Sequence, residues 1–124
     1  MQFVLPGDMK IELISPVRDD APVARFLERR GPGVHHITLL VTDVEVAVGR
    51  LEGHGYEVVD VDVRNPAWRE AFVRPRSGCG TLLQLADTTL RWDEPAEGIT
   101  LEDVLAGRVV FTEDERAVLR ELGS

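Results

Sequence analysis

The sequence contains a single cysteine, Cys79, among its 124 residues. One thiol cannot form an intrachain disulfide, and such scarcity is typical of proteins that fold in a reducing compartment. No apolar run approaches the roughly 20 residues that a membrane-spanning helix requires. The N-terminus also lacks the basic and apolar segments of a secretory signal. We therefore expect a cytoplasmic protein that does not associate with membranes.

Positive charge is also scarce, because 14 lysines and arginines face 22 aspartates and glutamates, which gives a net charge of -8. This excess repels the phosphates of nucleic acids, so we expect no nucleic-acid partner. A local group of arginines could still receive an anionic ligand: Arg64, Arg69, Arg74 and Arg76. The 44% of hydrophobic residues suffices for one domain with a buried core.

The first 34 residues predict a β-hairpin and a helix. Two β-prone runs, residues 2–5 and 9–14, flank a Pro6-Gly7-Asp8 turn. Glu12 lies within the apolar second run, and a carboxylate buried there would be costly unless it were paired. Residues 20–30 show helical spacing of apolar residues and end at Gly31. We interpret them as a helix that leads to a linker.

The next segment predicts the order β-α-β-β-β. Residues 35–41 alternate as a strand that begins with His35 and His36, and a Thr42-x-x-Glu45 capping box starts a helix. Residues 56–64, 68–74 and 81–86 then read as strands. In the strand 56–64, three valines at 59, 61 and 63 should face the side opposite Asp60 and Asp62. His36, but not His35, should share a face with Thr38.

Two parts of the chain resemble each other. Residues 3–13 and 72–85 share a Phe-Val-x-Pro run, a turn and an apolar strand, in which Glu12 and Gln84 take equivalent positions. The chain thus reads as an α+β protein with a closing β-hairpin of a partial module (1–16), a linker helix (17–34), a complete βαβββ module (35–87), and a polar loop with two helices (88–124). The two expected helices cover residues 100–106 and 112–122, the second behind a Thr112-x-x-Glu115 capping box.

The segments 11–16 (IELISP), 24–31 (ARFLERRG), 33–37 (GVHHI) and 72–85 (FVRPRSGCGTLLQL) resemble methylmalonyl-CoA epimerases. These belong to the vicinal oxygen chelate superfamily, together with glyoxalase I, bleomycin-resistance proteins and extradiol dioxygenases. The resemblance implies two βαβββ modules that curve around a divalent metal ion. The start of the first module, with its metal ligand, has no counterpart in this chain.

The resemblance further implies a set of site residues. Glu12, His36 and Gln84 would bind the metal, and Glu12 would also be the catalytic carboxylate. One carboxylate, one imidazole and one amide suit Co²⁺, Ni²⁺, Mn²⁺ or Zn²⁺. Epimerases usually have glutamate where this chain has Gln84, and an amide cannot accept a proton. Apart from the resemblance, three further residues could bind a phosphate or the adenine of an acyl-CoA substrate, or could be solvated strand ends: Trp68, Arg74 and Arg76. His35 and His54 are expected at the surface, away from the site, and Cys79 is expected to be exposed.

Two functional hypotheses follow. The first is a metal-dependent isomerase or lyase of methylmalonyl-CoA epimerase type, which would stabilise a metal-bound enolate of a small acid or an acyl-CoA thioester. The second is a non-catalytic, degenerate protein of the same fold that binds a small molecule or a protein partner. The unpaired hairpin favours a homodimer. Each site would then use Glu12, His36 and Gln84 of one chain, or two copies of His36 and Gln84.

Overall fold

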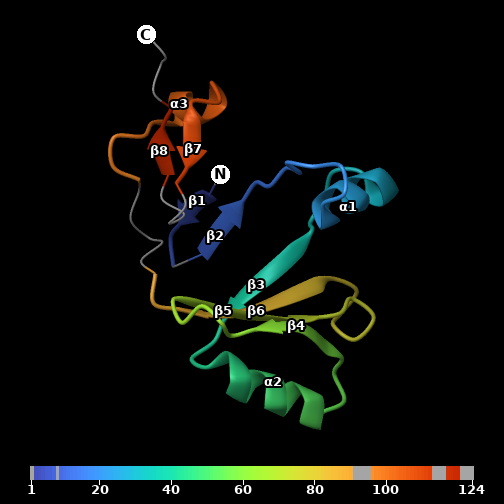
Figure 1. Ribbon diagram of the computed structural model, residues 1–124. Coiled ribbons are helices and arrows are strands. Elements are labelled where there is room, and N and C mark those ends of the chain that lie inside the picture. Colours follow the sequence, from blue (N-terminus) through green and yellow to red (C-terminus); the bar gives the residue numbers. More distant parts are fainter. Residues whose placement is uncertain (1, 8, 91–95, 113–116, 121–124) are drawn as a thin grey trace. The chain divides into compact units, whose positions relative to one another are not determined.

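The computed structural model of the chain describes residues 2–7, 9–90, 96–112 and 117–120 (Figure 1). Its contacts divide the chain into two units. We call residues 15–90 the sheet unit, and residues 1–14 together with 91–124 the hairpin unit. The sheet unit thus combines the expected linker helix with the complete module, and the hairpin unit combines the first and last expected segments. The exact segment limits at 16, 34 and 87 stay predictions.

The sheet unit confirms the expected order β-α-β-β-β. Its elements are β3 (His36–Leu40), α2 (Val44–Gly53), β4 (Val58–Asp62), β5 (Trp68–Val73) and β6 (Leu82–Thr88). The strands lie in the order β3-β6-β5-β4. The β3–β6 pair is parallel, whereas β6–β5 and β5–β4 are antiparallel. The first and last strands of the module are therefore neighbours.

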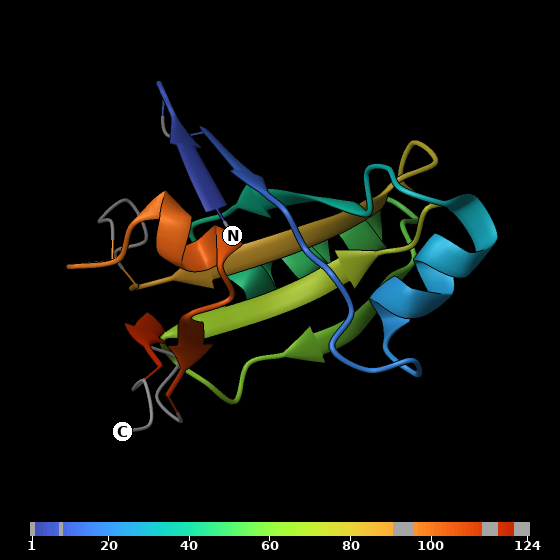
Figure 2. The ribbon, with the colours of Figure 1, turned by 90° about the horizontal axis from the view of Figure 1, so that it is seen from above.

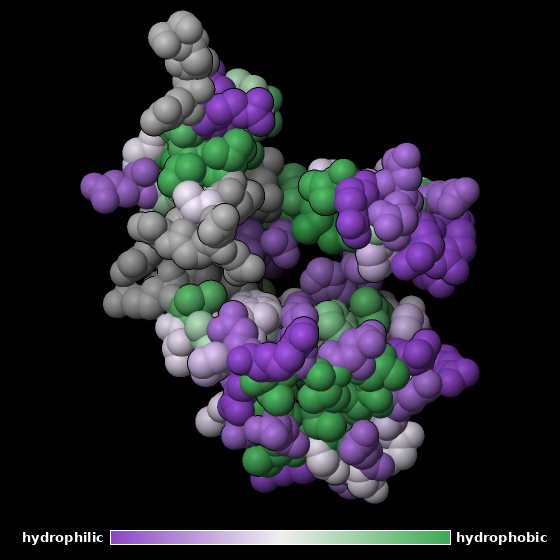
Figure 3. All heavy atoms as spheres, in the orientation of Figure 1, coloured by the Kyte–Doolittle hydropathy of each residue, from purple (hydrophilic) through white to green (hydrophobic). Residues whose placement is uncertain are grey.

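Helix α2 packs against one face of this sheet, which we call the helix face (Figure 1). Its Val44 is fully buried, as is Ala71 of β5, and Leu85 of β6 is 5% exposed. In Figure 3, apolar side chains gather between β4 and α2. The helix begins differently from the prediction, because the side chain of Asp43, and not that of Thr42, accepts a hydrogen bond from the backbone N–H of Val46. This contact leaves the Asp43 carboxylate at the positive end of the helix dipole.

Strand β4 departs from the expected alternation. Its register against β5 shifts between Val59 and Asp62, and Asp60 has a φ of 51°. Such a bulge inserts a residue and reverses which side chains share a face. Val61 is consequently 48% exposed, and the prediction that Val59, Val61 and Val63 line one face was wrong.

The helix expected at residues 20–30 is present as α1 (Pro22–Arg30). It ends, as predicted, at Gly31, whose φ of 69° suits a residue without a side chain. Its N-cap residue is Ala21, which makes no side-chain cap. In Figures 1 and 2, α1 and α2 lie on opposite sides of the sheet. The surface of α1 is mostly hydrophilic (Figure 3).

The hairpin unit contains two short antiparallel pairs and one helix. They are β1 (Gln2–Leu5) with β2 (Met9–Glu12), α3 (Leu101–Leu105), and β7 (Val109–Phe111) with β8 (Ala117–Leu119). The first hairpin and α3 agree with the predictions for residues 2–14 and 100–106. Across the described residues, no helix has the length and apolar character needed to cross a membrane.

The helix expected at residues 112–122 was wrong, because Ala117–Leu119 is strand β8. Residues 113–116, 121 and 122 lie outside the described part of the chain. Strand β8 pairs with β7, where Val110 lies opposite Val118. β-branched residues favour strands when a partner strand is available, and a capping box read from sequence carries no information about such a partner.

The two similar hairpins differ by one residue in register. Phe72 lies opposite Gln84 in β5–β6, whereas Phe3 lies opposite Ile11 in β1–β2. Neighbouring side chains point to opposite faces of a strand, so this shift places Phe3 and Glu12 on different faces. The sequence repeat is therefore only partly a structural repeat.

Candidate functional site

The face of the sheet opposite α2 carries His36, and we call it the histidine face. Parallel pairing sets His36 opposite Leu82 and Thr38 opposite Gln84. Because side chains alternate along a strand, His36, Thr38 and Gln84 share this face. His36 and Gln84 lie on neighbouring strands, two residues apart along the strand direction. The prediction that His36 shares a face with Thr38 is confirmed, whereas its role as a metal ligand stays a prediction.

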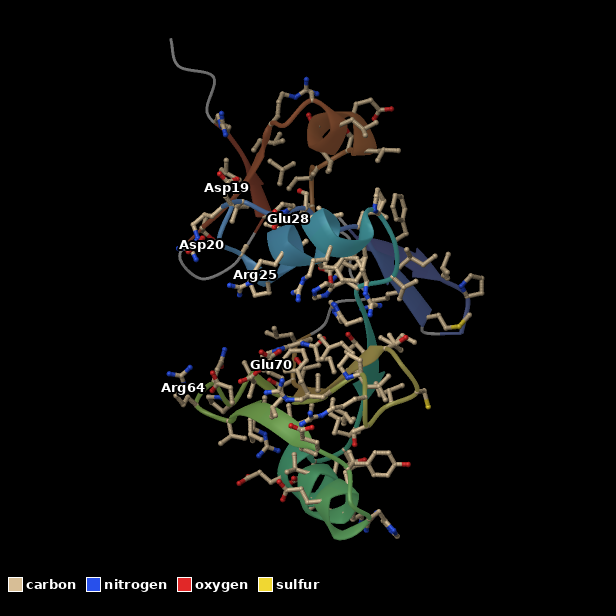
Figure 4. The ribbon with its side chains drawn as sticks, turned by 90° about the vertical axis from the view of Figure 1, so that its right-hand side faces the viewer. Asp19, Asp20, Arg25, Glu28, Arg64 and Glu70 are labelled. Carbon is tan, nitrogen blue, oxygen red and sulfur yellow. The ribbon has the colours of Figure 1, made fainter. Side chains whose placement is uncertain are left out.

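A chain of hydrogen bonds crosses the histidine face, and we call it the Gln84 network. The hydroxyl of Thr38 donates to Oε1 of Gln84 at 2.6 Å. Nε2 of Gln84 donates to Oε2 of Glu70 at 2.7 Å, and Nε1 of Trp68 donates to the same oxygen at 2.7 Å. Gln84 is only 8% exposed. Figure 4 shows Glu70 on the side of the sheet away from α2.

The two histidines contact each other at the start of β3. Their Nδ1 atoms are 2.9 Å apart, so one ring donates and the other accepts. When His36 donates, its Nε2 becomes the acceptor atom of the ring, as a metal ligand must be. His35 also packs edge-on against Phe26 of α1, with ring centroids 5.1 Å apart. Burial, and secondly the neighbouring His36, lower the pKa of His35.

The expectation that His35 is a surface residue was wrong, because His35 is half-buried. The contact with Phe26 explains this, and it depends on a helix that lies earlier in the chain. His54, at the end of α2, and Cys79 are exposed, as predicted. Cys79 has a φ of 54° within the turn between β5 and β6.

Glu12, the third expected ligand, belongs to β2 in the hairpin unit. Its carboxylate is exposed and accepts a hydrogen bond from Nε2 of Gln2 at 3.3 Å. An exposed carboxylate bears no cost of burial, so the structure gives Glu12 no need of a partner within the strand. Because Glu12 and His36 lie in different units, a site built from Glu12, His36 and Gln84 stays a prediction.

The donor chemistry of the histidine face fits part of a metal site. Among the described residues, no three side chains of histidine, cysteine, aspartate or glutamate form a group that could hold a metal ion. His36 and Gln84 can offer one imidazole nitrogen and one amide oxygen, which are ligands that first-row divalent metals accept. Any further ligands would come from elsewhere, such as Glu12 or a second chain.

The arginine group expected to bind an anion is largely engaged in ion pairs. Arg64 pairs with Asp62. Arg74 and Arg76 share Glu57, at 3.0 Å and 2.6 Å respectively. The hydrogen bond from Arg76 is the main reason why the pKa of Glu57 is lowered. All three arginines are exposed, so these pairs can exchange with a stronger anion.

The fourth arginine, Arg69, has a different role on the helix face. It lies 2.7 Å from Asp87, 3.2 Å from Glu45 and 3.6 Å from Asp43. Asp87 in turn accepts a hydrogen bond of 2.7 Å from the backbone N–H of Val44, the first residue of α2. The hydrogen bond from Arg69 is the largest cause of the lowered pKa of Asp87. Arg69 therefore joins β5 and β6 to α2.

A groove beside α1 was not found from the sequence. It is lined by both basic and apolar residues, among them Arg25, Phe26, Arg29, Arg30, His35, Arg74 and Leu82. Arg25 of α1 is labelled in Figure 4, on the same side of the sheet as Glu70. The spacing of Arg25, Arg29 and Arg30 along a helix was the available signal, but their proximity to Arg74 required the fold.

Comparison with known proteins identifies the family of the chain. Residues 1–72 match the family described as the glyoxalase/bleomycin resistance protein/dioxygenase superfamily. An ethylmalonyl-CoA/methylmalonyl-CoA epimerase of Cereibacter sphaeroides is 38% identical over 87 residues, which are 67% of this chain and 65% of that protein. The human mitochondrial methylmalonyl-CoA epimerase is 31% identical over 86 residues, 67% of this chain and 49% of that protein.

Solved structures show the same relationship. Methylmalonyl-CoA epimerase from Mycobacterium tuberculosis superimposes with a TM-score of 0.63 at 28% identity, over 72% of this chain and 61% of that chain. A variant of the Streptomyces coelicolor epimerase, in complex with 2-nitronate-propionyl-CoA, gives a TM-score of 0.54 at 30% identity, over 60% of this chain and 55% of that chain.

The chain spans about half to two thirds of the length of these curated relatives. The match to the family covers more than half of the chain, and the α+β fold is similar to that of the solved epimerase from Mycobacterium tuberculosis. The protein described here is therefore a member of the glyoxalase/bleomycin resistance protein/dioxygenase superfamily.

Proposed function

We propose that this protein acts as an epimerase of an acyl-CoA thioester, of the methylmalonyl-CoA type. The observation that carries the proposal is the placement of His36 beside the Gln84 network on one face of the sheet. The relatives named as methylmalonyl-CoA epimerases support it. An epimerase of this type must remove the proton next to the thioester carbonyl and return a proton to the other side.

We further propose that His36 and Gln84 hold a divalent metal ion, Co²⁺, Ni²⁺, Mn²⁺ or Zn²⁺. Nε2 of His36 and Oε1 of Gln84 would be the ligating atoms, and Glu12 would complete the set. When bound, such an ion supplies stabilisation for the negative charge that forms on the thioester oxygen. The amide of Gln84 can bind but cannot take a proton, so Glu12 remains the proposed proton acceptor.

The basic groove beside α1 suits the phosphate groups of coenzyme A. Arg74 lines this groove together with arginines of α1, while Phe26 and Leu82 supply apolar contact. Of the residues proposed for substrate binding, Arg74 thus has the strongest support, and Arg76 lies two residues further along the chain. Trp68 donates its indole N–H to Glu70, so its contribution would be to shape the histidine face.

A homodimer could assemble in two ways, which differ in whether Glu12 belongs to the site. In the first, each chain builds a site from its own Glu12, His36 and Gln84. In the second, two sheet units face each other and each site holds two copies of His36 and Gln84. The second assembly needs no residue of the hairpin unit, so Glu12→Gln would leave its metal affinity unchanged.

One observation favours a second candidate function. The amide of Gln84 already makes hydrogen bonds at both ends within the sheet, to Thr38 and to Glu70. A polar group satisfied in this way is stable without a ligand. This arrangement fits a non-catalytic protein of the same fold, which binds a small molecule or a protein partner.

The two functions differ in proton exchange. The experiment incubates methylmalonyl-CoA with the untagged protein in D₂O and follows the α-proton signal by NMR, with bound metal measured in parallel. Loss of the signal with wild-type protein, and its persistence with His36→Ala, would support the epimerase. An unchanged signal with folded, metal-loaded wild-type protein would refute it and favour the non-catalytic function.

A further inference from the structure

The Gln84 network raises the question of what fixes the orientation of the amide. A side-chain amide has a donor end and an acceptor end, and exchanging them changes little in shape. The hydroxyl of Thr38 can either donate or accept, so Thr38 alone would tolerate both orientations. An ionised carboxylate, by contrast, can only accept. Glu70 is therefore the member of the network that decides which end of Gln84 faces which strand.

The contacts of Glu70 fix the orientation of the Gln84 amide. Its Oε2 accepts from both Nε2 of Gln84 and Nε1 of Trp68, each at 2.7 Å. An indole N–H is only a donor, so Trp68 keeps the carboxylate in an accepting role. Glu70 is half-buried on β5, adjacent to β6. The NH₂ end of Gln84 must consequently point to β5, and Oε1 must point to β3, the strand that carries His36.

We propose that Glu70 is a positioning residue, which directs the amide oxygen of Gln84 toward His36 for metal binding. The inference rests on the proposed function, because it concerns the same metal site. An amide oxygen has two acceptor positions, and the hydrogen bond from Thr38 uses one of them. The other can serve a metal. Groups that orient a ligand through a hydrogen bond commonly change metal affinity 10–100-fold when they are removed.

Glu70 has a second, electrostatic effect. The amide is a neutral ligand, so it contributes no charge to the site. The carboxylate of Glu70, one hydrogen bond away, places a negative charge near a bound cation without being a ligand itself. In this network Gln84 provides the ligand atom and Glu70 provides the negative charge. A single carboxylate at position 84 would provide both.

The test measures Co²⁺ affinity of the full chain by calorimetry, with the visible absorption of bound Co²⁺ as a spectroscopic signature. Glu70→Gln keeps the shape but removes the charge and weakens the fixed polarity, because an amide has a donor end as well as an acceptor end, and we expect about tenfold weaker binding. Glu70→Leu also removes the hydrogen bond, so we expect a loss approaching a hundredfold. Glu45→Gln, an equal change of charge on α2, is the control and should bind as the wild type does.

Exchanging the two side chains provides a rescue. In the double variant Glu70→Gln with Gln84→Glu, the amide at position 70 can donate to the carboxylate at position 84, so the hydrogen bond is reversed but kept. We expect Co²⁺ affinity to return at least to the wild-type value. This variant keeps a hydrogen bond between positions 70 and 84, so it tests whether the network tolerates exchange of its charge and remains informative if Glu70→Leu does not fold.

Two outcomes would overturn the inference in distinguishable ways. If Glu70→Gln binds Co²⁺ like the wild type while His36→Ala loses binding, the positioning role is wrong and the proposed metal site stands. If the wild type shows no binding that depends on His36, the metal site and the role of Glu70 are both wrong.

Discussion

The two faces of the four-stranded sheet use strands β5 and β6 for opposite purposes. On the helix face, Ala71, Val73 and Leu85 are buried against α2. On the histidine face, their chain neighbours Glu70 and Gln84 form hydrogen bonds across the strands. Because side chains alternate along β5 and β6, the residues on one face stabilise the fold and their neighbours on the other face form the candidate site. Substitutions on the first face should change folding, and those on the second should change ligand binding.

The largest effect on folding should come from the helix face. Leu85→Ala removes a buried side chain beneath α2 and should lower the free energy of unfolding by about 3 kcal/mol. Urea denaturation followed by circular dichroism measures the change. Leu39 lies opposite Leu85 on the same face but is 46% exposed. Leu39→Ala is therefore the matched control, and an equal loss in both variants would contradict the assignment of the core.

A smaller loss should follow from breaking the connection between the sheet and α2. Asp87→Ala removes the acceptor of Arg69 and of the backbone N–H of Val44. Because a buried N–H then lacks its partner, we expect a loss of about 1–2 kcal/mol in the free energy of unfolding. Asp62→Ala, which removes an exposed ion pair, should change the free energy by less. If the order of the two were reversed, Asp87 would not hold α2.

The same carboxylate predicts a dependence on pH. The pKa of Asp87 is lower in the folded protein than in the unfolded chain, chiefly through the hydrogen bond from Arg69. Its stabilisation is present above the unfolded pKa, near 3.8, and is lost as the pH falls through the folded pKa. The melting temperature should therefore fall less steeply between pH 6 and pH 2 for Asp87→Asn than for the wild type. Parallel curves for both proteins would contradict the shift.

The smallest effect on folding is expected on the histidine face. Thr38→Val keeps the shape of the side chain but removes the hydroxyl that donates to Gln84, and should cost about 1 kcal/mol. Thr38→Val should weaken Co²⁺ binding by a larger proportion than it lowers the free energy of unfolding, since the amide of Gln84 loses one of its two fixed contacts. Thermal melting and calorimetry on the same sample compare the two. A large drop in melting temperature with unchanged Co²⁺ binding would reverse the roles of the faces.

The sequence allowed the sheet unit to be predicted well because its patterns are local. The alternation at residues 35–41, the helical spacing behind Asp43 and the glycine at 31 each depend on neighbours within one turn or strand. The fold class and the placement of His36 followed from them. The bulge at Asp60 was missed because a register shift depends on the partner strand.

The candidate site was predicted only in part, because its contacts join distant segments. His36 and Gln84 came from the family resemblance. Glu70 and Thr38 were not recognised, since their link through Gln84 depends on the pairing of β3, β6 and β5. A carboxylate at position 70 followed by Ala-Phe-Val was a visible signal. Without the register of β5 against β6, nothing associated it with Gln84.

The parallel pairing of β3 with β6 has a consequence for the order of folding. This contact joins residues 36–40 to residues 82–86 and closes a loop of about 45 residues, whereas β5 and β6 are joined by a short turn. Closing the longer loop costs more chain entropy, so we infer that the hairpin carrying Glu70 and Gln84 forms before the edge strand docks. Hydrogen exchange should then detect opening of β3 while β5 and β6 remain protected. His36 would then separate from, and return to, Glu70 and Gln84, which stay paired on β5 and β6. The affinity for a ligand would therefore depend on the stability of the pairing between β3 and β6.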